Sequence, residues 1–193
     1  HQKVSRDTAM KDAVALLDRV GIPSPAERAR DYPHQLSGGM RQRVMIAMAV
    51  SCRPKVLIAD EPTTALDVTV QAQIFDLLNE IQREFGAAII LITHDMGAIS
   101  EMADRVAVMY AGRVIEEASA DSVLDTPQHP YARGLIDCIP ALGKGDTALK
   151  EIPGVVPPLH LLGAGCAFAA RCAHADARCL SEKPLLANHG HHP

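Results

Sequence analysis

The chain has 193 residues, of which 48% are hydrophobic and 22% charged, and its formal net charge is -4. This composition is typical of a globular protein with a buried core, and it excludes a disordered, collagen-like or low-complexity chain. The longest apolar runs fall far short of the ~20 residues of a membrane-spanning helix, and the absence of a basic excess or stripe argues against nucleic-acid binding.

The first part of the chain predicts two helices separated by a loop. Apolar residues recur with helical period over residues 8–20, and Gly21 followed by Pro23 ends this helix. A loop rich in proline and charged residues comes next. Residues 36–39 (Leu-Ser-Gly-Gly) then open a second helix, and Pro54 ends that segment.

The middle of the chain alternates strand and helix. An apolar run at residues 56–59 predicts a strand that is buried on both faces, as in a parallel sheet. Asp67 can cap a long helix that Gly86 ends. Residues 88–93 predict a second buried strand, and Asp95 can cap a short helix after it. This order is typical of an α/β doubly wound domain.

The last part of the chain consists of a predicted hairpin followed by a segment with little regular secondary structure. Residues 106–115 predict a hairpin that turns at residues 111–112. Beyond residue 116, prolines interrupt every pattern, and only short helices are expected, at residues 121–124 and 131–138. This part reads as a small appended module or tail.

Two carboxylates, Asp60 and Glu61, follow the first strand at its C-terminal end, where ligands bind in open α/β sheets. Because side chains alternate along a strand, neighbouring acids serve one site only if the chain leaves strand geometry there. One acid could then hold Mg²⁺ while the other orients an attacking water, as phosphoryl transfer requires. The alternative is a strand that ends in an ordinary polar turn.

Two further motifs carry candidate chemistry. His94 follows the second strand at the same sheet edge, where it could touch a transferred phosphate, although a lone histidine is more often structural. Ser37, Gly38 and Gly39 open a helix whose backbone an anion can approach closely, with a hydroxyl donor and a positive helix end. The alternative is an ordinary serine N-cap followed by glycines.

In this order, these motifs resemble the ATP-binding-cassette (ABC) transporter ATPases, over about residues 32–112. The resemblance implies that Asp60 is the Walker B magnesium ligand and that Glu61 is the catalytic base. It also implies that His94 contacts the γ-phosphate of ATP. The signature that clamps the nucleotide of the opposite subunit would be Ser37, Gly38 and Gly39, and the D-loop would be Ala65, Leu66 and Asp67.

Further stretches narrow the resemblance to the dipeptide/oligopeptide importer ATPases. Residues 34–44 and 63–69 look like that subfamily, with Met40 where many relatives carry Gln. Residues 126–132 and 139–140 resemble its C-terminal extension. The resemblance implies an energy-coupling subunit in which ATP hydrolysis at a head-to-tail dimer interface drives peptide uptake.

No Gly-x-x-x-x-Gly-Lys-Ser/Thr phosphate loop occurs in the sequence. In this family that loop precedes the signature, so the resemblance implies a C-terminal fragment that would not bind ATP well alone. Residues 1–115 would be the C-terminal part of a RecA-like ABC nucleotide-binding domain. Within them, residues 1–53 would belong to the helical subdomain and residues 54–115 to the core. Residues 116–193 would be the small irregular C-terminal extension.

The resemblance also implies cofactors and partners. The cofactors are ATP and Mg²⁺. The partners are a second ABC ATPase subunit, identical or paralogous, two transmembrane permease subunits and, indirectly, an extracytoplasmic peptide-binding protein. The subunit would lie peripherally at the cytoplasmic face of the cell membrane. The alternatives are a non-transport ABC ATPase of DNA repair or translation, an importer of nickel or another small solute, and a regulatory or metal-binding module without catalysis.

Three of the five cysteines cluster near the end of the chain, at Cys166, Cys172 and Cys179. The surrounding segment is polar, and small modules can replace a core by thiolate ligation. Soft ligands favour zinc or an iron–sulfur cluster, whereas the alternative is three buried structural cysteines. The resemblance implies a [4Fe–4S] cluster, whose fourth ligand would be Cys138, a histidine such as His189, or a residue beyond the chain.

Overall fold

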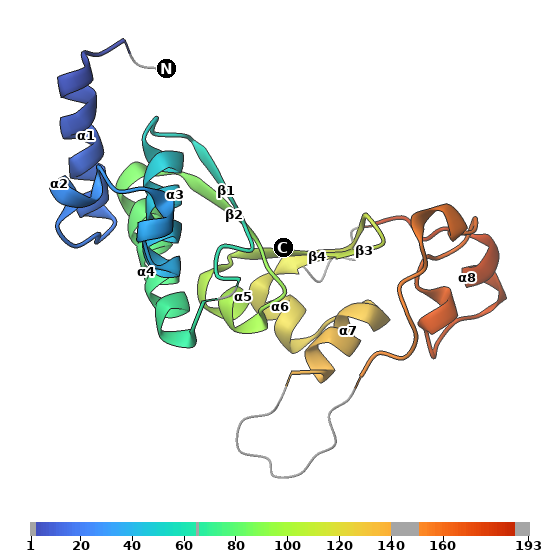
Figure 1. Ribbon diagram of the computed structural model, residues 1–193. Coiled ribbons are helices and arrows are strands. Elements are labelled where there is room, and N and C mark those ends of the chain that lie inside the picture. The colour runs from blue at the N-terminus through green and yellow to red at the C-terminus, as the bar shows by residue number, and fades with distance from the viewer. Residues whose placement is uncertain (1–2, 65, 140–150, 188–193) are drawn as a thin grey trace. The chain divides into compact units, whose positions relative to one another are not determined.

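The structure is a computed structural model that describes residues 3–64, 66–139 and 151–187. The chain divides into two compact units, residues 1–94 and residues 95–193 (Figure 1). Two residues named above, Ala65 of the expected D-loop and His189 of the expected metal site, lie outside the described residues. The expected boundary between the nucleotide-binding domain and the C-terminal extension, after residue 115, differs from this division by compactness and stays a prediction.

The first unit contains the two predicted helices of the N-terminal part. Helix α1 (Arg6–Arg19) ends where expected, because Gly21 adopts a left-handed conformation with φ 72°. The amide of Gly21 donates to the carbonyl of Asp18, and the amide of Ile22 donates to that of Leu17, both at 2.9 Å. This pair of bonds closes the helix end. The predicted loop holds the short helix α2 (Pro25–Arg28) and a 3₁₀ turn (Pro33–Gln35).

Helices α3 (Gly38–Val50) and α4 (Val68–Phe85) run side by side in this unit (Figure 1). Each begins at a residue that the sequence suggested. The α4 helix also ends as predicted, at Gly86 with φ 61°. It buries an apolar face, as its period requires, through Ile74, Phe75, Leu77, Leu78 and Ile81.

Strands β1 (Val56–Asp60) and β2 (Ala88–Ile92) pair in parallel, which confirms the α/β class, with Asp60 opposite Ile92. The prediction that both faces are buried is wrong. Leu57 and Ala59 are buried, but 64% of Ile58 and 50% of Ile90 are exposed on the opposite face. The physical reason is that no other described element of the first unit covers that face, and a run of apolar residues does not reveal which neighbours exist.

The second unit is built on the predicted hairpin. Helix α5 (Met96–Met102) precedes strands β3 (Arg105–Tyr110) and β4 (Arg113–Ser119). The turn lies where expected, and both of its residues are left-handed, with φ 47° at Ala111 and 76° at Gly112. Such a pair matches the right-handed twist of the flanking strands. Helices α6 (Ala120–Asp125) and α7 (Pro130–Asp137) follow, and the core consists of Val108, Ala118, Val123 and Ala132.

The proline-broken extension is more ordered than the sequence suggested. Buried Glu116 of β4 accepts the amides of Gln128 and His129 at 2.9 and 2.8 Å, so it fixes the entry to α7. Arg171 donates to the carbonyl of Pro153 at 2.7 Å. Two 3₁₀ turns (Leu159–Leu161 and Ala169–Arg171) and the short helix α8 (Ala177–Ser181) complete the unit. Within the described part of the chain, no helix combines the length and hydropathy that crossing a membrane demands.

Candidate functional site

The two adjacent acids lie at the C-terminal end of β1, and the chain leaves strand geometry between them. Asp60 is the last residue of the strand, and Glu61 has a left-handed backbone with φ 45°. The amide of Glu61 still donates to the carbonyl of Ile92 at 2.8 Å, so the turn stays attached to β2. This geometry meets the condition under which neighbouring acids can serve one site. Left-handed backbone at a non-glycine residue is costly and concentrates at functional positions.

Both carboxylate oxygens of Glu61 have partners. The Thr64 hydroxyl donates to Oε2 at 2.8 Å, and Nδ1 of His94 lies 3.1 Å from Oε1. The Thr64 hydrogen bond, and after it the contact with His94, lower the pKa of Glu61 below its ordinary value. The structure therefore brings together two residues that are 33 positions apart in the sequence, and their contact favours the ionised form of the Glu61 carboxylate.

Thr64 was not among the residues that the sequence singled out. It reaches Glu61 because residues 61–64 form a turn in which the amide of Thr64 donates to the carbonyl of Glu61 at 3.2 Å. A signal was present, since Pro62 stands at the second position of the turn, where proline is favoured. A hydroxyl residue three positions after an acid is then placed to bond with it.

Replacing Thr64 by valine is expected to raise the pKa of Glu61 toward its ordinary value, because the hydrogen bond that lowers it most is lost. Ionisation of Glu61 stabilises the fold above its unfolded pKa, and this contribution disappears as the pH falls through the folded pKa. In the variant this contribution is therefore smaller, and its loss is complete at a higher pH. Carboxyl ¹³C NMR titration measures the shift. Thr69→Val, at an exposed position of α4, is the isosteric control, and equal titration of Glu61 in both variants would refute the assignment.

Asp60 differs from Glu61, because its side chain has no partner among the described residues. Its side chain is exposed and forms no hydrogen bond or ion pair with any residue that the structure describes. A free carboxylate suits Mg²⁺, which keeps several waters and is commonly bound by one or two carboxylates together with nucleotide phosphates. The exposed carboxylate of Asp60 therefore fits its predicted role as a magnesium ligand.

The signature residues lie at the beginning of α3. The Ser37 hydroxyl oxygen accepts the amide of Met40 at 3.3 Å, and Asp67 in the same way accepts the amide of Val70 at 2.9 Å at the start of α4. A Cβ placed on Gly39 would lie only 2.9 Å from Cγ1 of Val70. The two helix starts are thus in contact, and a side chain at Gly39 has no room unless the Val70 side chain or one of the helices shifts. Such an exposed helix start offers amides to an anion.

The three cysteines of the extension are free and half-buried. The amide of Cys166 donates to the carbonyl of Cys179 at 2.8 Å, and Sγ of Cys172 accepts the amide of His174 at 3.4 Å. Among residues 3–64, 66–139 and 151–187, no group of three or more histidines, cysteines and acids could hold a metal ion. The three thiols are therefore not gathered into a metal site among the described residues, and Cys138 does not join them in one.

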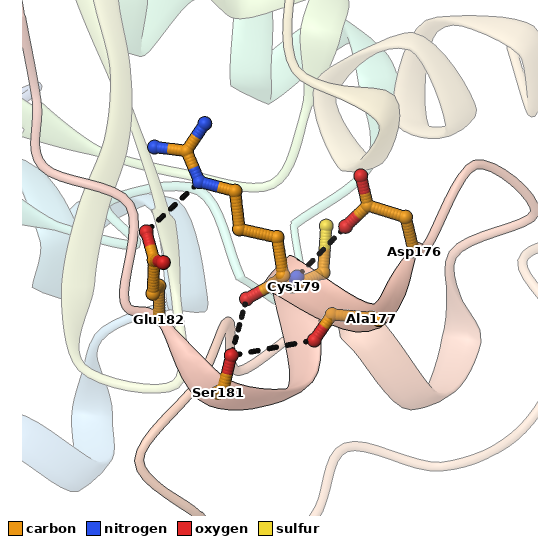
Figure 2. A network of polar contacts seen from close by, with 6 residues as sticks. Asp176, Ala177, Cys179, Ser181 and Glu182 are labelled. Carbon is orange, nitrogen blue, oxygen red and sulfur yellow. Dashed lines mark hydrogen bonds and ion pairs between the residues drawn. The ribbon is translucent and has the colours of Figure 1, made fainter.

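Helix α8 is held by local polar contacts around Cys179 (Figure 2). Asp176 caps the helix by accepting the amide of Cys179 at 2.9 Å, and this bond lowers the pKa of Asp176. Arg178 donates to Glu182 at 2.8 Å, and the Ser181 hydroxyl donates to the carbonyl of Ala177 at 3.4 Å. The local structure around Cys179 thus has an ordinary helical explanation.

Comparison with known proteins gives two family matches. A family model described as "ABC transporter" matches residues 1–64, and one described as "Oligopeptide/dipeptide transporter, C-terminal region" matches residues 115–179. The oligopeptide transport ATP-binding protein OppD of Haemophilus influenzae is 52% identical over 98% of this chain and 59% of its own length. The dipeptide transport ATP-binding proteins DppD of Escherichia coli and Bacillus subtilis are 50% and 51% identical, over 96% and 93% of the chain. The chain covers 57% and 53% of these two relatives.

Proposed function

Because this chain belongs to the ABC transporter ATP-binding family, we propose that the full protein is the ATP-hydrolysing, energy-coupling subunit of an importer for di- or oligopeptides. The observation that carries the proposal is the identity of about one half with peptide transport ATP-binding proteins over nearly the whole chain. The family match over residues 115–179 supports the peptide class, since its description names oligopeptide and dipeptide transporters.

Each site residue has a proposed role in hydrolysis. The ionised carboxylate of Glu61 accepts a proton from the attacking water, and Asp60 holds Mg²⁺ when nucleotide is bound. His94, in contact with Glu61, approaches the γ-phosphate. The backbone amides at the start of α3, around Ser37, Gly38 and Gly39, bind the nucleotide of the opposite subunit. Asp67 caps the neighbouring helix α4 and so orders its start.

The proposed partners follow from this role. They are a second ABC ATPase subunit, two transmembrane permease subunits and, indirectly, an extracytoplasmic peptide-binding protein. The subunit would associate peripherally with the cytoplasmic face of the membrane through the permeases, and no nucleic acid takes part.

The proposal is tested by co-purifying the full-length protein with the chains encoded beside it and measuring ATP hydrolysis by the assembled complex. The expected result is a complex with permease subunits whose ATPase activity rises when a peptide-loaded binding protein is added. A complex that responds to Ni²⁺-loaded binding protein and not to peptides would replace the peptide class by a metal. A full-length protein that hydrolyses no ATP with any partner would refute the proposal.

A metal site at Cys166, Cys172 and Cys179 is a separate proposal, with an iron–sulfur cluster or zinc as its occupant. It is supported by the spacing of three unpaired, half-buried thiols. The described residues do not gather these thiols into a ligand group, so the site requires the rest of the full-length protein to bring its ligands together. Full-length protein purified without oxygen should contain iron and sulfide, or zinc, and Cys172→Ser should lower that content. Cys52→Ser, at an exposed position, is the control. Metal-free protein with three freely alkylated thiols would rule the site out.

A further inference from the structure

We propose that Arg43 is a positioning residue, which together with Gln73 holds the beginning of α3 in register with the beginning of α4. Neither residue touches the acids of the candidate site. The inference rests on the proposed function, because it concerns the step in which the start of α3 meets the nucleotide of the opposite subunit.

Arg43 donates in two directions. Nη1 donates to the carbonyl of Val20 at 2.7 Å, and Nη2 donates to Oε1 of Gln73 at 3.0 Å. Val20 is the C-cap of α1, so the guanidinium lies where a helix end carries a partial negative charge. A Cβ on Gly21 would lie 3.0 Å from Nη1, so the glycine leaves room for the guanidinium. A planar fork can serve both acceptors at once, which a lysine ammonium does less well.

The contact with Gln73 lies one helical turn beyond the contact between Gly39 and Val70. Gly39 faces Val70 at the helix starts, and Arg43, four residues later in α3, bonds Gln73, three residues later in α4. Positions three and four apart share one face of a helix. The contact between Gly39 and Val70 and the hydrogen bond between Arg43 and Gln73 therefore define how α3 lies along α4.

The α4 helix in turn is tied to the turn that carries Glu61. The Gln71 amide group donates to the carbonyl of buried Thr63 at 3.3 Å. A shift of α3 along α4 would thus change the distance between the signature residues and the acid turn. The Arg43–Gln73 bond opposes that shift, which is why its loss should affect closure on the nucleotide more than folding.

The test measures ATP-dependent association of the full-length ATPase subunits in a Glu61→Gln background, which keeps nucleotide bound. Gln73→Ala removes one hydrogen bond to a charged group, so the ATP concentration for half-maximal association should rise about tenfold. Arg43→Ala should raise it at least as much, and the double variant should cost no more than Arg43→Ala alone. Arg43→Lys with Gln73→Glu should restore most of the loss, since the pair is then ionic.

Arg41→Ala is the matched control, because Arg41 is exposed on the same helix and its side chain forms no hydrogen bond or ion pair with any described residue. Gln73 is itself exposed, so its variant tests the inference even if Arg43→Ala fails to fold. An unchanged half-maximal ATP concentration in Gln73→Ala, or additive effects in the double variant, would overturn the inference. A lowered melting temperature with unchanged association would also overturn it, by showing a structural role alone. A parent that never associates with ATP would instead overturn the proposed function.

Discussion

Replacing Glu61 by glutamine in the full-length protein is expected to lower the rate of ATP hydrolysis by ~10²-fold or more, the usual scale of a lost general base. Glutamine keeps the length of the side chain and can still accept the hydrogen bond that Thr64 donates. It cannot accept a proton from water. ATP binding should therefore persist, and the ATP-bound assembly should accumulate. Single-turnover kinetics and equilibrium nucleotide binding measure the two effects separately.

The control for this experiment is Glu80→Gln, which removes the same charge from an exposed position of α4 that has no partner among the described residues. Its turnover should equal that of the parent protein. Hydrolysis undiminished in Glu61→Gln would remove Glu61 from the reaction. A loss of ATP binding as large as the loss of turnover would assign it to binding instead.

Replacing Gly39 by glutamate is expected to abolish ATP-driven association while nucleotide binding to the variant's own subunit persists. Two effects act together. The new Cβ would lie 2.9 Å from Cγ1 of Val70, so the Val70 side chain or the two helices must shift to accommodate it. The new carboxylate would also stand at the helix start that is proposed to receive a phosphate, where like charges repel. Size-exclusion chromatography with and without ATP measures the association.

A second substitution separates the two effects. Val70→Ala removes the methyl group that a side chain at Gly39 would strike. Gly39→Ala alone should cost about 1–3 kcal/mol of stability through overpacking, and adding Val70→Ala should recover most of it. Gly39→Glu with Val70→Ala should fold but still fail to associate. Restored association in that double variant would show that Gly39 serves packing alone.

Much of the fold was predictable because its boundaries depend on local chemistry. Ser37 and Asp67 cap their helices with side-chain oxygens, and Gly86 ends α4 in a left-handed conformation. The hairpin turn at Ala111 and Gly112 has the same local origin. Each of these features depends on a few neighbouring residues, so a single sequence is enough to predict it.

The burial of the strands and the partner of Glu61 were not predictable in the same way. An apolar run such as residues 56–59 indicates a strand that neighbouring elements bury, but it does not identify the element that covers each face of the sheet. Thr64 needed the turn geometry before its hydroxyl could be assigned to the acid. The short helix α8 was not predicted, because five residues show too little apolar periodicity for a helix to be recognised.

The uncovered face of β1 and β2 bears on how sharply the first unit unfolds. The denaturant dependence of a transition, its m-value, grows with the surface that unfolding exposes, and so does the change in heat capacity. Val56, Ile58, Ile90 and Ile92 are already about half or more exposed in the folded chain, so unfolding adds less apolar surface from them than it would from fully buried side chains. Residues 1–94 should therefore melt over a broader range of denaturant than a unit of equal length whose sheet is covered on both faces.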